Sequence, residues 1–169
     1  VHTLHGSSFH RYQPALIRYF YLLSEKIAGF CTDYFISVSS VILDRYIRAG
    51  IGKNKKSSVV RSGFQLKDYR KCQTLRKKIR ELFNIGEDEI SIGMIGRLFP
   101  LKGQEYLLRV FAKISDDYPD THLILVGDGI LRETFEKFVE SKNLKNRVHF
   151  TGLVKPEDIP AYASAIDIG

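Results

Sequence analysis

The sequence has no tryptophan, a single methionine, five prolines and only two cysteines, Cys31 and Cys72. Two cysteines cannot supply the disulfide framework that holds small secreted domains together, and they fit a reducing cytosol. The chain also lacks the run of about 20 apolar residues that a membrane-spanning helix requires. Repeats and low-complexity segments are absent as well. These absences favour an ordinary globular protein of the cytoplasm.

Acidic residues are scarce in the first half of the chain. Residues 1–85 carry 16 Lys and Arg against 5 Asp and Glu, a balance of +11, whereas residues 86–169 carry 10 against 14, a balance of −4. Such asymmetry indicates two units with different surroundings. We expect their boundary between Arg61 and Tyr69, after an apolar strand that ends in a serine–glycine turn.

The basic half carries no recognisable motif for reading nucleic-acid bases, so we expect no nucleic-acid partner. A charged helix is usually a solvated face. A cytosolic membrane surface is the other interpretation, because anionic head groups attract Lys and Arg at about 1 kcal/mol each. The sequence therefore predicts a cytoplasmic protein. Peripheral contact with an anionic membrane is the further interpretation of its basic half.

The segment of residues 90–103 is the most informative part of the chain. Its apolar beginning predicts a parallel strand that is buried on both faces. Gly96 follows and would let a ligand approach the backbone closely. Arg97 and Lys102 then lie at the carboxyl end of the strand, before a helix expected from about Gln104. Two cations beside a helix N-terminus suit a diphosphate; the alternative is that both are solvated loop residues.

Strands and helices then alternate to the end of the chain. We expect strands at residues 122–126 and 147–150, helices at 131–142 and from 156, and a further strand starting at 167. Right-handed crossovers turn this order into a parallel sheet with helices on both faces.

The first half follows the same alternation. We expect a helix from Pro14 to about Phe30, with one apolar face directed inward. A second helix should be capped by Ser39 or Ser40 and terminated by Gly50. Strands are expected at residues 1–4, 34–38 and 58–61, and a basic helix at residues 72–83. The apolar face of the first helix comprises Leu16, Phe20, Leu23 and Ile27.

Three segments of the second half resemble successive signatures of the donor-binding domain of family-4 retaining glycosyltransferases, which have the GT-B fold. These are residues 95–103 (IGRLFPLKG), 123–129 (LILVGDG) and 148–154 (VHFTGLV). Earlier segments resemble the end of the acceptor-side domain and the linker of that family. These are residues 1–10 (VHTLHGSSFH), 34–51 (YFISVSSVILDRYIRAGI) and 59–63 (VVRSG).

The resemblance implies an α/β protein of the GT-B type, with two Rossmann-like parallel-sheet domains that are each only partly present. Residues 1–65 would end the acceptor-side domain, and residues 66–169 would begin the donor domain. The family's glycine-rich opening loop would precede Val1, and its pair of glutamates, eight positions apart, would follow Gly169. We therefore interpret the chain as an internal fragment that is inactive alone.

The resemblance further implies a hexosyltransferase that moves a sugar from a nucleotide-sugar to a glycan or lipid-linked glycan, with retention of configuration. Arg97 and Lys102 would bind the donor diphosphate. No cofactor is implied, since the nucleotide-sugar is a substrate, and no metal is expected. The backbone of five residues would line the nucleotide pocket: Gly96, Gly127, Gly129, Gly152 and Val154.

The histidines at positions 2, 5 and 10 lack cysteines or carboxylates at ligand spacing, so a zinc site is not indicated. His5 precedes a glycine at the end of a strand, and the resemblance implies that it faces the transferred sugar as a catalytic residue. The alternative is a histidine that forms hydrogen bonds within its loop.

Two other functional classes stay open. A sugar-nucleotide epimerase shares the fold and a diphosphate site, although its catalytic acids are not found here. A nucleotide-binding or interaction module without catalysis is the second alternative.

Overall fold

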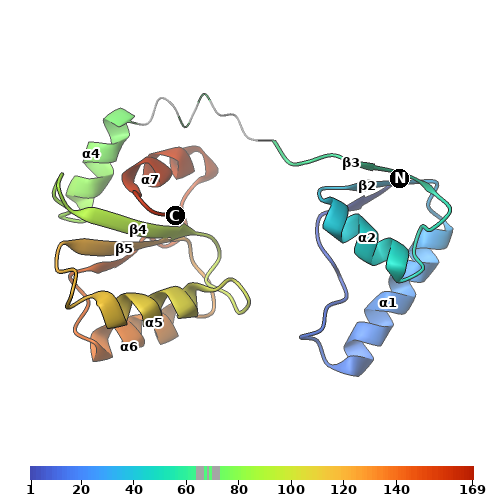
Figure 1. Ribbon diagram of the computed structural model, residues 1–169, viewed down its shortest axis with the longest axis horizontal. Coiled ribbons are helices and arrows are strands. Elements are labelled where there is room, and N and C mark those ends of the chain that lie inside the picture. The colour runs from blue at the N-terminus through green and yellow to red at the C-terminus, as the bar shows by residue number, and fades with distance from the viewer. Residues whose placement is uncertain (64–66, 68, 70–72) are drawn as a thin grey trace. The chain divides into compact units, whose positions relative to one another are not determined.

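The computed structural model describes residues 1–63, 67, 69 and 73–169, and the chain forms two compact units, Val1–Phe64 and Gln65–Gly169. Each unit is built from a parallel sheet and helices (Figure 1), which confirms the α/β fold class. The predicted boundary between residues 65 and 66 lies outside the described residues, as does Cys72. Within the described parts, no helix is long and apolar enough to cross a bilayer.

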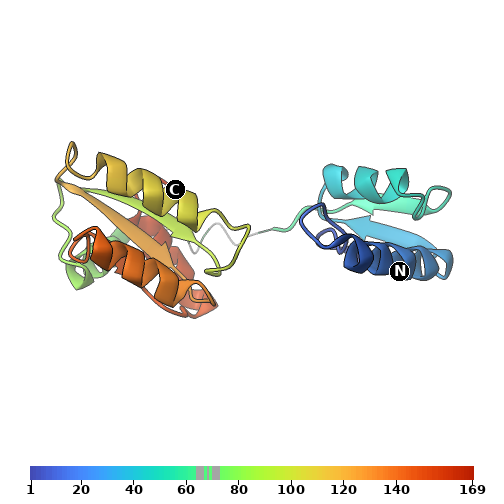
Figure 2. The same cartoon turned by 90° about the horizontal axis from the view of Figure 1, so that it is seen from below.

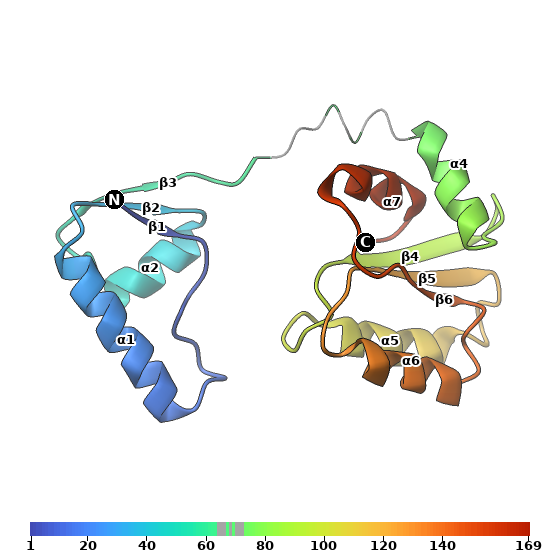
Figure 3. The same cartoon turned by 180° about the vertical axis from the view of Figure 1, so that it is seen from behind.

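The first unit contains three parallel strands in the order β1 (His2–Leu4), β2 (Tyr34–Ser37) and β3 (Lys56–Val59). Helix α1 (Ala15–Phe30) joins β1 to β2, and α2 (Ser40–Arg48) joins β2 to β3. Each connection moves the chain one strand further in the same direction across the sheet. Because such connections are right-handed, both helices lie on the same face of the sheet (Figure 3).

The ends of α2 follow the sequence signals. The hydroxyl of Ser39 accepts a hydrogen bond from the Val41 amide at 3.2 Å and caps the helix. Gly50 follows the helix with φ of +80°, a conformation that glycine adopts without strain. Strand β3 begins at Lys56, two residues before the predicted start at residue 58.

The predicted inward face of α1 is wrong. Leu16, Phe20, Leu23 and Ile27 are all exposed, by fractions that run from 46% for Leu23 to 81% for Leu16. Leu22 and the buried Gly29 face the core instead. The reason is that α1 is apolar on almost every side, so its periodicity could not select the face that packs.

The second unit contains the parallel strands β4 (Ile90–Ile95), β5 (Thr121–Val126) and β6 (Val148–Phe150), in that order. The chain then returns to the other side of β4, where Ile168 forms a parallel bridge with Ile92. The strand order therefore reverses at β4. Open α/β sheets bind ligands at such a switch point, beyond the carboxyl ends of the strands.

Helices cover both faces of this sheet, as Figure 1 shows. Helices α5 (Gln104–Ile114) and α6 (Arg132–Ser141) lie on one face, the face seen from below in Figure 2. On the other face, α4 (Gln73–Leu82) packs against α7 (Ile159–Ala165), which follows a short 3-10 turn.

Strand β5 forms the centre of the unit, and all six of its residues are buried. Leu123 and Leu125 pack beneath α5 and α6, whereas Ile124 and Val126 pack on the opposite face with Ile85. This two-sided burial is the reason for the uninterrupted apolar run.

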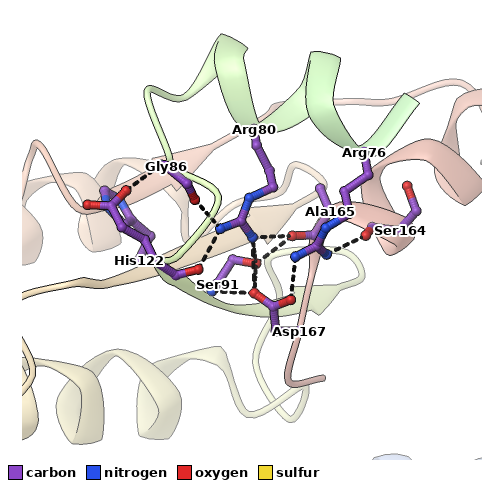
Figure 4. Close-up of polar contacts among 9 residues, drawn as sticks. Arg76, Arg80, Gly86, Ser91, His122, Ser164, Ala165 and Asp167 are labelled. Carbon is purple, nitrogen blue, oxygen red and sulfur yellow. Dashed lines mark hydrogen bonds and ion pairs between the residues drawn. The ribbon is translucent and has the colours of Figure 1, made fainter. Parts of the chain in front are cut away.

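Arg80 of α4 ties three segments of the second unit together (Figure 4). Its guanidinium, in a residue only 3% exposed, donates hydrogen bonds to Ser91 on β4 at 3.1 Å and to Asp167 at 3.0 Å. It also donates to the carbonyl oxygens of Gly86 and Glu89. The returning chain is thereby fixed to β4 at the position where the strand order reverses.

Asp167 receives further donors. The Ser91 amide donates to Asp167 at 2.8 Å, and Arg76 donates to its other carboxylate oxygen at 2.6 Å. Burial alone would raise the pKa of Asp167, but these hydrogen bonds outweigh burial and lower the pKa to about 2.

His122 and His149 contact each other on the face of the sheet opposite α5 and α6. Nδ1 of His122 lies 3.0 Å from Nε2 of His149, and the Phe83 ring stacks on His149 with centroids 4.9 Å apart. Glu89 lies 3.3 Å from the other nitrogen of His122. Burial, and then the neighbouring His122, lower the pKa of His149 to about 4, so this ring is neutral at pH 7.

Replacing Arg80 with Ala should destabilise the second unit by about 3 kcal/mol, because several buried acceptors lose their donor at once. Lys77→Ala is the matched control, since Lys77 is a basic residue of the same helix whose ion pair with Glu87 is exposed. Its removal should change stability by less than about 0.5 kcal/mol. Urea unfolding of the whole protein measures both changes, and equal effects would contradict the assigned role of Arg80.

The neutral His149 also predicts how stability depends on pH. Its folded pKa of about 4 lies below the ordinary 6.5, so the unfolded chain binds the proton more readily between these values. Stability from this group is complete above pH 6.5 and is lost as the pH falls toward 4.

Urea midpoints of the wild type and His149→Phe, measured from pH 7 to pH 4, test this expectation. The wild type should lose more stability over this range than the variant. The stability that the ionised Asp167 contributes is lost only below about pH 4. Parallel curves for the two proteins would contradict the assignment.

Candidate functional site

The loop that joins β4 to α5, residues 96–103, follows the carboxyl end of β4 at the switch point of the sheet. Gly103 and Leu101 both have positive φ, at +93° and +75°, and they turn the chain sharply into α5. The first residue of that helix is Gln104, as the sequence predicted. The positive end of the helix dipole therefore adjoins this loop.

Arg97 and Lys102 are the two cations of this loop, and both are exposed. Neither side chain forms an ion pair or hydrogen bond with another residue in the described part of the chain. Their charge is therefore not neutralised by a neighbouring carboxylate. A bound anion could take both as partners without breaking an existing contact.

The loop after β5 packs directly against the loop after β4. The Leu98 amide donates a hydrogen bond to the Asp128 carbonyl at 2.9 Å. A Cβ on Gly127 would lie 2.3 Å from the Gly96 carbonyl oxygen, and one on Gly129 would lie 2.2 Å from that of Leu98. No side chain fits at either position, so both glycines are required by the packing of the two loops.

The loop after β6 joins the same edge. Gly152 forms an antiparallel bridge with Gly127, and the Thr151 hydroxyl accepts a hydrogen bond from the Gly127 amide at 3.1 Å. Val154 packs against the buried cluster of Ile85, Ile124 and Val126, on the face of the sheet opposite α5 and α6. The structure thus brings together the ends of all three strands, whereas contact of these backbones with a nucleotide stays a prediction.

Gly96 differs from the two glycines that face it. A Cβ added there would meet only Nε2 of Gln104, at 3.9 Å. Its φ also lies outside the region that favours glycine. Neither packing nor backbone conformation therefore requires glycine at this position, which leaves open space beside the backbone for a ligand.

Gln104 is a positioning residue that the sequence did not reveal. It is 1% exposed, and its Nε2 donates to the Arg97 carbonyl at 3.0 Å. Its side-chain oxygen is buried without a partner among the described residues. A polar residue at the start of an amphipathic helix gives no sign of burial, because such positions are usually solvated.

His5 lies in the first unit, after the carboxyl end of β1, where it is exposed. Its predicted catalytic role stays a prediction. His2 is a packing residue, since its ring stacks on Phe35 with centroids 5.5 Å apart.

Glu25 of α1 belongs to a partly buried polar cluster. It accepts hydrogen bonds from Ser8 at 2.7 Å and from Tyr46 at 3.1 Å, and His2 lies 3.7 Å from its other oxygen. Burial is the main cause that raises the pKa of Tyr46. The cluster fastens the loop after β1 to both helices of the first unit.

Among the described residues, no group of three or more His, Cys, Asp or Glu side chains is arranged to hold a metal ion.

Comparison with known proteins places these features in a family. The family model described as "Glycosyl transferases group 1" matches residues 76–168, more than half of the chain. A GDP-mannose-dependent alpha-(1-6)-phosphatidylinositol monomannoside mannosyltransferase from Mycolicibacterium smegmatis is 30% identical over 93 residues, which are 55% of this chain and 24% of that protein. The alpha-monoglucosyldiacylglycerol synthase of Acholeplasma laidlawii is 22% identical, over 99% of this chain and 44% of that protein.

Solved structures agree on the fold. Anabaena HepE in complex with UDP-glucose superposes with a TM-score of 0.76 at 24% identity, covering 98% of this chain and 44% of that chain. Sucrose-phosphate synthase from Thermosynechococcus elongatus gives a TM-score of 0.71 at 27% identity, covering 88% and 37%. The chain thus spans less than half the length of these relatives.

The structural neighbours are glycosyltransferases of the GT-B fold, and the family match runs from α4 to the bridge at the end of the chain. The loop with Arg97 and Lys102 lies within the matched segment. This protein therefore belongs to the family of glycosyl transferases group 1.

Proposed function

We propose that the protein is a family-4 retaining hexosyltransferase, and that its donor diphosphate binds at the loop between β4 and α5. One observation carries this proposal: Arg97 and Lys102 have no partner among the described residues at the sheet's switch point, beside a Gly96 that packing does not require. The complexes of HepE with UDP and with UDP-glucose support a nucleotide-sugar as donor.

The two cations would stabilise the negative charge that grows on the nucleoside diphosphate as the sugar leaves. Electrostatic stabilisation of this kind acts where charge develops and is often the largest contribution to catalysis. The N-terminal end of α5 would add to it. The protein's own cations then perform the task that Mg²⁺ performs in other enzymes. The loop of residues 151–154 would border the nucleobase, and His5 would face the transferred sugar.

The acceptor is proposed to be a glycan or a lipid-linked glycan. The printed names of two relatives, a phosphatidylinositol monomannoside mannosyltransferase and a monoglucosyldiacylglycerol synthase, support a lipid-linked acceptor. The +11 balance of residues 1–85 supports contact with the anionic cytosolic face of a membrane.

Replacing Arg97 or Lys102 with Ala should weaken nucleoside-diphosphate binding by about 1.5–3 kcal/mol each, the scale of a charge-assisted hydrogen bond. Calorimetric titration of the whole protein with UDP and with GDP measures this loss. Lys113→Ala is the control, because this exposed cation lies at the far end of α5, roughly 15 Å along the helix axis. Full affinity in both loop variants would refute the proposed donor site.

The glycines give a second test. Gly96→Ala should leave the stability of the protein within about 0.5 kcal/mol of the wild type, since the added methyl meets no backbone. It should nevertheless weaken UDP or GDP binding. Gly129→Ala, in contrast, should destabilise the second unit by more than about 2 kcal/mol, because its Cβ collides with the Leu98 carbonyl. If Gly96→Ala bound nucleotide as tightly as the wild type, the nucleotide would not occupy the space beside Gly96.

A further inference from the structure

The side chain of Gln104 connects the two ends of the loop between β4 and α5. Gln104 is the first residue of α5, and its Nε2 donates a hydrogen bond to the Arg97 carbonyl, seven positions earlier, at 3.0 Å. Figure 1 shows this loop where β4 ends and the chain turns into α5. Arg97 and Lys102, the two cations of the candidate donor site, both belong to the segment that this bond closes. The hydrogen bond therefore constrains how far apart the backbones of the two cations lie.

The loop contains backbone strain that its surroundings must enforce. Hydrogen bonds to the loop after β5 hold its beginning, and within the loop the Lys102 amide donates to the Phe99 carbonyl at 3.2 Å. Leu101 has φ of +75°, a conformation that is unfavourable for a bulky side chain. Strained backbone persists only where other contacts fix it. At the end of the loop, the hydrogen bond from Gln104 is such a contact.

Gln104 fixes the loop at a cost to stability. The residue is 1% exposed, and its side-chain oxygen is buried without a hydrogen-bond partner among the described residues. A buried acceptor without a donor has lost its water and gained nothing in return, whereas an apolar side chain of similar size would not carry this penalty. Stability alone therefore favours an apolar residue at this position. Features that lower stability in this way are expected where function requires them.

We propose that Gln104 is a positioning residue for the donor diphosphate, which closes the loop so that Arg97 and Lys102 are spaced for one ligand, and that it lowers stability in doing so. The inference rests on the proposed donor site at this loop. Gln104 lies beside the space at Gly96, where a Cβ would be 3.9 Å from its Nε2, but it acts through the cations. Its effect on affinity comes from preorganisation, because the ligand then meets cations that need no further ordering.

Gln104→Leu separates affinity from stability, because leucine has a similar size and no hydrogen-bonding group. Arg97 is exposed, so water can replace the donor that its carbonyl loses. The urea midpoint of the whole protein should equal or exceed that of the wild type, since the unpartnered oxygen is gone. Calorimetric titration should nevertheless show that UDP or GDP binding is weakened by about fivefold, the net effect of one hydrogen bond. A merely structural role predicts the reverse, a lower urea midpoint with unchanged affinity, and that result would overturn the proposal.

Ser115→Ala is the matched control. Ser115 is also a buried polar residue, 3% exposed, at the other end of α5, and its hydroxyl donates to the Ala112 carbonyl at 3.3 Å. Its replacement should leave nucleotide affinity as it is in the wild type. Equal losses of affinity in Ser115→Ala and Gln104→Leu would mean that any change in α5 disturbs the site, and the specific role of Gln104 would be refuted.

A double-mutant cycle tests whether Gln104 acts through Arg97. In the Arg97→Ala background, Gln104→Leu should weaken nucleotide binding by about twofold or less, because the side chain that it helps to position is absent. The same fivefold loss in both backgrounds would contradict this coupling.

The same titrations distinguish failure of this inference from failure of the donor site. If the wild type binds neither UDP nor GDP, or if Arg97→Ala and Lys102→Ala bind them as the wild type does, the donor site is refuted and the role of Gln104 with it. If Arg97→Ala and Lys102→Ala lose affinity while Gln104→Leu keeps it, the donor site stands and only the role of Gln104 is overturned.

Discussion

The candidate donor site depends on the close packing of two backbone loops. Gly127 and Gly129 lie so near the carbonyl oxygens of Gly96 and Leu98 that no Cβ fits between them. This contact holds the loop after β4 against the end of β5, and the buried Gln104 adds its hydrogen bond to the Arg97 carbonyl, so the path of the chain through Arg97 is fixed from both sides. A loop fixed in this way can present cations without first being ordered by a ligand.

Most of the second unit could be predicted from the sequence, because its signals are local. The buried strand β5 reads as an apolar run, and the strand ends are marked by glycines. Arg80 could not be predicted in the same way. A basic residue on an amphipathic helix normally points to solvent, and its partner Asp167 lies 87 residues further along the chain. The packing face of α1 was missed because nearly every side of that helix is apolar.

Charge is organised differently in the two units. The first half of the chain is basic overall, whereas residues 86–169 have a balance of −4. Arg97 and Lys102 are therefore cations of a segment with net negative charge, so an anion bound by them depends on short-range contacts. The basic first half instead attracts anions at longer range, and salt screens this attraction. Short-range binding of an anion is thus expected at Arg97 and Lys102, and long-range attraction of anions at residues 1–85.

Hydrogen–deuterium exchange of the whole protein, with and without saturating UDP or GDP, would show where the diphosphate binds. A diphosphate at the switch point should take hydrogen bonds from backbone amides at the start of α5 and slow their exchange. We expect protection in residues 96–105, with the exchange of α4 unchanged. Binding that protects other segments and leaves residues 96–105 at their free exchange rates would contradict it.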